Sequence, residues 1–167
     1  IQFVSPPGRS IPFTIAAGED TATFLEGPSI DFQAGSTAGT IILTATLNDE
    51  TETATFQLAP APVLVDSIRS AKAAGLLTLS VSGFDNTRST TRARFTFLDA
   101  RSNTLAGPLV ADVTDAFAAY FQNAEMGGMF VLRAKFPVTG NAALIDSVQV
   151  ELTNSAGVTT ASAKIAE

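Results

Sequence analysis

Apolar and polar residues alternate with a period of two along much of this 167-residue chain. In the first third, the alternation covers residues 11–15, 30–33 and 53–58, as expected for antiparallel strands with one buried face. Residues 40–47 are rich in β-branched side chains and lie between Gly39 and a polar turn at 48–50. The pattern therefore predicts a hairpin made of residues 40–47 and 53–59.

The same alternation continues in the rest of the chain, at residues 77–83 and 93–97. Residues 130–136 place their aromatic side chains on one face and their basic side chains on the other. Residues 148–152 and 159–165, joined by a turn at 154–157, predict a closing hairpin.

A single stretch has helical rather than strand periodicity. Its apolar residues recur at steps of three and four, at Val113, Phe117, Tyr120, Phe121 and Ala124. Thr114 or Asp115 is the expected N-cap, and Gly127-Gly128 is the expected stop. We therefore expect one short helix over about residues 114–124, lying on a sheet through its aromatic stripe.

The segment Ala59-Pro60-Ala61-Pro62 separates two regions of alternating pattern. Its prolines favour an extended, stiff path, so we expect a domain boundary there, with domains at 1–62 and 63–167. Frequent Gly and Pro turns predict an all-β chain of two antiparallel β-sandwich domains, the second carrying the helix. The first domain is small, and a strand from outside this sequence could complete it.

The net charge of −6 belongs to one part of the chain. Residues 1–62 contain seven acidic residues and one basic residue, a net of −6, whereas residues 63–167 contain nine of each. This acidic balance argues against a nucleic-acid partner, because phosphate contacts need a basic face. The longest apolar runs are also too short to span a membrane.

The residue types that are missing restrict the chemistry. The chain has no His and no Cys, which excludes His- or Cys-based catalysis, thiolate and imidazole metal sites, and disulfides. It has one Tyr and no Trp, which disfavours an aromatic-lined sugar cleft. No catalytic or cofactor-binding residue is therefore predicted.

Two groups of charged residues are candidate sites. Asp49, Glu50 and Glu52 form an acidic turn that could bind Ca²⁺, although the spacing matches no EF-hand loop and solvated charges are also common at a hairpin tip. Arg88, Arg92 and Arg94 could form a face for an anionic partner, with 92 and 94 on one side of a strand. The alternative is that these arginines are outward residues whose stems cover the sheet.

Asp and Asn residues also mark two turns, at residues 83–88 and 99–103. Such side chains bond their own backbone in turns, which explains their presence without a ligand.

Residues 35–41, Gly-Ser-Thr-Ala-Gly-Thr-Ile, resemble the Gly-rich strand entry of immunoglobulin-like and Calx-β-like repeats in large bacterial surface and secreted proteins. Residues 65–68, 81–88, 128–130, 136–140 and 147–150 resemble a C-terminal β-sandwich module of long exported proteins of soil bacteria. The resemblance implies two immunoglobulin-like domains in tandem, export, and an adhesion or scaffold role without catalytic residues.

We therefore expect a non-enzymatic structural or adhesion module of a larger exported protein, at the cell surface, outside the cell or in the periplasm. Its expected partners are neighbouring modules of the same polypeptide, or a surface protein or glycan, with no cofactor. The alternative is a glycan- or Ca²⁺-binding accessory module attached to a secreted hydrolase. Because the sequence begins at Ile1 and not at Met, a fragment or a processed product is expected.

Overall fold

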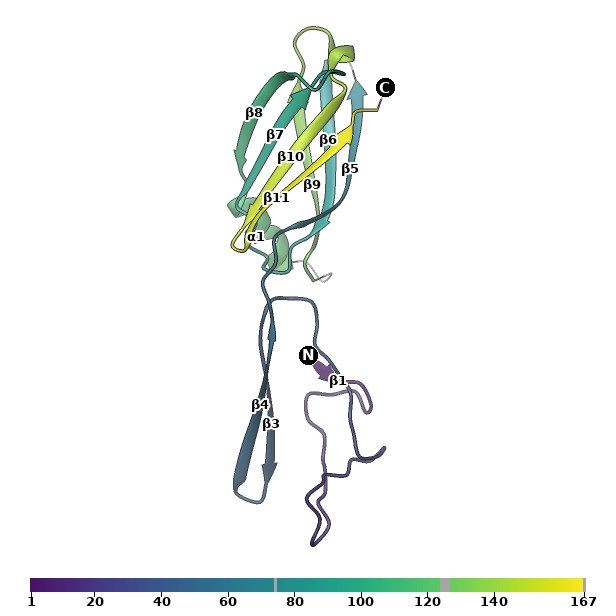
Figure 1. Ribbon diagram of the computed structural model, residues 1–167, viewed down its shortest axis with the longest axis vertical. Helices are drawn as coiled ribbons and strands as arrows, with labels where there is room; N and C mark the ends of the chain where they lie inside the picture. The colour runs from purple at the N-terminus through teal and green to yellow at the C-terminus, as the bar shows by residue number, and fades with distance from the viewer. Residues whose placement is uncertain (74, 124–126, 167) are drawn as a thin grey trace. The chain divides into compact units, whose positions relative to one another are not determined.

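The computed structural model describes residues 1–73, 75–123 and 127–166 and is mostly antiparallel β-structure with one α-helix (Figure 1). The density of contacts divides the chain into two units, Ile1–Ser36 and Thr37–Glu167. The domain boundary expected at residues 62–63 stays a prediction.

The unit Ile1–Ser36 has little regular structure. Strands β1 (Gln2–Phe3) and β2 (Phe32–Gln33) pair antiparallel, and no side chain of residues 1–36 is buried. The strand predicted over 11–15 is wrong: only Thr14 forms a bridge, with Thr23. Pro12 removes a ladder donor in that segment, and a single bridge does not make a sheet that could bury one face of it.

In the second unit, strands β3 (Gly39–Leu47) and β4 (Glu50–Leu58) form a two-stranded hairpin. The hairpin confirms the prediction, with its second strand starting three residues earlier than expected. Asn48 has a φ of 54° in the two-residue turn, a conformation that Asn adopts more readily than most residues.

The rest of the unit forms two antiparallel sheets, which we call the two-sheet body (residues 63–165). A three-stranded sheet has the order β5-β6-β9, and a four-stranded sheet has the order β11-β10-β7-β8. The strand bounds are β5 Leu64–Ala73, β6 Leu76–Phe84, β7 Arg92–Leu98, β8 Thr104–Asp112, β9 Met129–Pro137, β10 Ser147–Asn154 and β11 Gly157–Lys164. A short 3₁₀ helix, η1 (Ala142–Leu144), precedes β10.

One core fills the space between the two sheets. The ring of Phe136 on β9 lies edge-on to those of Phe95 and Phe97 on β7, with both pairs of ring centroids 5.0 Å apart. Every second residue of the central strands β6, β7 and β10 is buried, as period-two alternation predicts. The core residues are Val63, Leu77, Leu79, Val81, Ala93, Phe95, Phe97, Val113, Phe117, Phe121, Phe130, Val148, Val150, Leu152 and Ile165.

Helix α1 (Thr114–Asn123) confirms the predicted helix and packs onto this core. Phe117 stacks edge-on against Phe130, with ring centroids 5.1 Å apart. The predicted N-cap at Thr114 or Asp115 is wrong, because the helix already begins at Thr114; the carboxylate of Asp112 accepts the Thr114 backbone N–H at 2.9 Å. The described part of the helix ends at Asn123. Ala124, which the prediction included, lies outside the described residues.

Candidate functional site

Arg94 of the predicted arginine face is ion-paired within the structure. Arg92 and Arg94 do share one side of β7, but Arg94 Nη1 lies 3.1 Å from Glu151 Oε2 on the neighbouring strand β10. Arg92 lies opposite Asp112 across the β7–β8 pair. Arg88 lies in the loop after β6, at a φ of 53°, rather than on the strand. Each of the two strand arginines therefore lies directly opposite a carboxylate residue on a neighbouring strand.

The acidic turn is exposed at the end of the β3–β4 hairpin. Asp49 lies in the two-residue turn, and Glu50 and Glu52 lie on one face of β4. Among the residues that the structure describes, no group of three or more Asp, Glu, His or Cys side chains is close enough to hold a metal ion. Calcium binding by this turn stays a prediction.

A buried carboxylate, Asp85, organises one end of the two-sheet body. Its side chain has no solvent exposure, and it follows directly after β6. Its Oδ1 accepts the Thr87 backbone N–H at 2.9 Å and the Thr87 hydroxyl at 2.6 Å. Its Oδ2 accepts the backbone N–H groups of Ser89 and Thr90, at 2.9 and 3.0 Å, and the Thr90 hydroxyl at 2.7 Å. This confirms the prediction that the side chain caps its own turn.

The Asp85 network also reaches the other end of the sequence. Asn154, the last residue of β10, donates its side-chain amide to Asp85 Oδ1 at 2.9 Å and to the Ala61 carbonyl at 2.9 Å. Burial by itself raises the pKa of Asp85, but the hydrogen bonds from Thr87, Asn154 and Thr90 outweigh it and hold the pKa below its usual value. The carboxylate is therefore charged, buried and fully hydrogen-bonded.

The neighbouring Asn86 joins the hairpin to the two-sheet body. Its backbone carbonyl accepts the Ala38 N–H at 2.8 Å, just before β3. Its side chain donates to the Ala59 carbonyl at 2.9 Å and accepts the Ala61 N–H at 3.0 Å, just after β4. We call these contacts the Asn86 clasp. The sequence identified Asn86 only as a turn residue, because its partners are distant in sequence.

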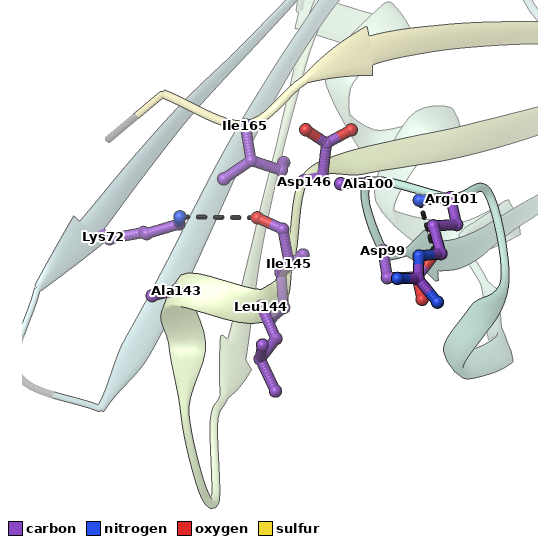
Figure 2. Close-up of a pocket in the computed structure, with 9 residues that line it drawn as sticks. All are labelled: Lys72, Asp99, Ala100, Arg101, Ala143, Leu144, Ile145, Asp146 and Ile165. Atoms are coloured by element: carbon purple, nitrogen blue, oxygen red, sulfur yellow. Dashed lines mark hydrogen bonds between the residues drawn. The ribbon is translucent and has the colours of Figure 1, made fainter.

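A shallow hollow of about 350 Å³ lies beside η1 (Figure 2). Lys72 reaches across it and donates to the Ile145 carbonyl at 3.4 Å. Asp99 caps the β7–β8 turn, and hydrogen bonds from Asn103, with a further one from Arg101, hold its pKa below the usual value. Asp146 is paired with Lys164. The carboxylates at this hollow are therefore already engaged in structural contacts.

In the part of the chain that the structure describes, no helix is long and apolar enough to cross a membrane. No family model and no curated protein sequence matches this chain.

Proposed function

We propose that this chain is a non-enzymatic structural or adhesion module of a longer exported bacterial protein. The Asn86 clasp is the observation that best supports a structural role. A module that spaces or displays its neighbours needs a joint that resists bending, and the clasp bonds both ends of the β3–β4 hairpin to a loop of the two-sheet body. The resemblance stated from the sequence supports the exported, multi-module context.

We further propose that the two-sheet body is an immunoglobulin-like sandwich. Its seven strands form two antiparallel sheets, of three and four strands, around one core, which is the architecture common to that class.

The joint can be tested with two spin labels, because the chain has no cysteine of its own. Thr53→Cys on β4 and Thr160→Cys on β11 are both exposed sites for labelling. Pulsed electron–electron double resonance between the two labels should give a single narrow distance distribution in the otherwise unaltered chain. Asn86→Ala should broaden this distribution, because the side-chain hydrogen bonds to Ala59 and Ala61 are both lost.

Asn123→Ala is the matched control, since that amide donates to the Ala119 carbonyl within helix α1. The control should keep the narrow distribution. A broad distribution in the unaltered joint would overturn the proposal of a fixed spacer.

A further inference from the structure

The outer face of the β5-β6-β9 sheet carries three exposed basic residues. Arg69 on β5 and Arg133 on β9 both lie opposite Ser80 of the central strand, and Lys135 lies two residues beyond Arg133. Adjacent strands are about 4.8 Å apart, so the two arginine backbones lie about 10 Å apart across the sheet. We call these three residues the basic sheet face.

No ion pair within the described residues involves the basic sheet face. Among the described residues, the ion pairs are Arg94 with Glu151 and Lys164 with Asp146, and both belong to the other sheet or its edge. The nearest acidic residue along β5, Asp66, lies at a bulge and accepts a hydrogen bond from Ser82. Arg133 and Lys135 are about 7 Å apart along β9, within the Debye length of about 8 Å at physiological salt, so the potentials of these two cations add.

The other half of the same outer face is apolar. Leu64 on β5 is 64% exposed, and Met129 and Val131 on β9 are each 52% exposed. Leu64 and Met129 flank Phe84 of the central strand, so they form one row across the sheet. Exposed apolar side chains beside arginines are typical of protein interfaces rather than of plain solvated sheets.

The tip of the β3–β4 hairpin, residues 45–52, carries the complementary chemistry. Leu47 pairs with Glu50, and Ala45 pairs with Glu52, so these four side chains share one face of the ribbon. Leu47 is 43% exposed, and both glutamates are exposed. The tip also lies in the segment that carries the whole net charge of −6, whereas residues 63–167 are neutral overall.

We propose that the hairpin tip of one copy docks on the outer face of the β5-β6-β9 sheet of a second copy. Glu50 and Glu52 meet Arg133, Lys135 and Arg69, and Leu47 meets the apolar row. This inference names the partner of the proposed structural module, and so rests on that function.

Such docking is head-to-tail, because the two surfaces that meet are different. The ribbon of nine-residue strands extends about 30 Å, which carries the tip away from the body to which its base is bonded. A heterologous contact that does not close into a ring continues from copy to copy. The assembly should therefore grow with concentration rather than stop at a dimer.

The test is sedimentation equilibrium of the 167-residue chain over a wide range of concentration. We expect the weight-average mass to rise past that of a dimer. The association constant should fall more than tenfold between about 50 mM and about 500 mM salt, because charge pairs at an exposed interface are screened. Arg133→Glu with Lys135→Glu should remove the association, and so should Glu50→Arg with Glu52→Arg.

Mixing these two double variants is the decisive measurement, because each variant alone has a tip and a face of the same charge, whereas in the mixture every tip meets a face of opposite charge on the other variant. The mixture should assemble again with the two variants in equal amounts, although neither variant associates alone. Arg92→Glu with Arg101→Glu makes the same change in net charge as the face variant, at two exposed sites away from the face, and should leave the association unchanged.

A chain that stays monomeric at millimolar concentration in low salt would overturn the inference. So would assembly that stops at a dimer, or face and tip variants that associate like the unaltered chain. The spin-label measurement on the joint is independent of these results, so a fixed joint in a monomeric chain would overturn the docking inference alone.

Discussion

Strands β3 and β6 are both nine residues long and both alternate, yet they end in opposite environments. In β6 every second side chain is buried, whereas in β3 only Ile41 is. The difference lies in their neighbours: β6 is paired on both edges and faces a second sheet, while β3 is paired only with β4. An alternating sequence thus specifies a strand and its two faces, but the topology decides whether either face is covered.

The largest expected effect comes from the covered strand. Leu79, at the centre of β6, has no solvent exposure. Leu79→Ala should lower the free energy of unfolding by about 2–5 kcal/mol, because lost transfer energy and a residual cavity add together. Chemical denaturation followed by circular dichroism measures the loss, and a loss below about 1 kcal/mol would contradict the tight core described above.

An intermediate effect is expected at the end of that strand. Asp85→Asn keeps the shape of the side chain but replaces an acceptor oxygen with a donor facing N–H and O–H groups. We expect a loss of about 2–3 kcal/mol at pH 7, since buried donors are left without an acceptor. Thr87→Ser, which retains both donors to Asp85, is the matched control and should cost less.

The same variant should also change the dependence of stability on pH. The pKa of Asp85 is lowered in the folded state, so the unfolded chain takes up the proton first as the pH falls. The carboxylate therefore stabilises the fold fully above its unfolded pKa of about 4, and this contribution is lost as the pH falls toward the folded pKa. The free energy of unfolding, measured by denaturation at pH 6 and at pH 3, should differ less between the two pH values in Asp85→Asn than in the unaltered chain.

The smallest effect is expected on the uncovered face of β3. Ile42 is 62% exposed and lies among threonines, opposite Thr55. Ile42→Thr should change the free energy of unfolding by less than about 0.5 kcal/mol. Ile41→Thr, at the neighbouring position with 4% exposure, should cost more than 1 kcal/mol. Equal costs at the two positions would contradict the difference between the two faces.

The sequence predicted most of the elements whose signals are local. The β3–β4 and β10–β11 hairpins have regular alternation around turn residues, and helix α1 has aromatic residues at helical spacing. Strand β5 was not predicted, because a bulge between Val65 and Ser67 interrupts its alternation. Strand β8 was not predicted either: Gly107-Pro108 interrupts it, and its apolar residues stand at both odd and even positions, so it shows no alternation.

The candidate surfaces depended on contacts that the sequence does not display. Arg94 and Glu151 are 57 residues apart, and only the β7–β10 register brings them together. The bases of residues 130–136 were correctly placed on one face, but their alignment with Arg69 follows from the order β5-β6-β9. The sequence thus predicts relations between residues that are close in sequence, whereas contacts that depend on strand order and register cannot be predicted from it.

The Asp85 network has a consequence for the order in which the chain is made. During translation, Asp85 is added 69 residues before Asn154. The amide of Asn154 completes the set of donors around the Asp85 carboxylate. While the chain is still growing, the charge at this end of the core lacks that partner, and water must solvate it in place of the amide. The set of donors around this carboxylate is therefore complete only after β10 has been translated.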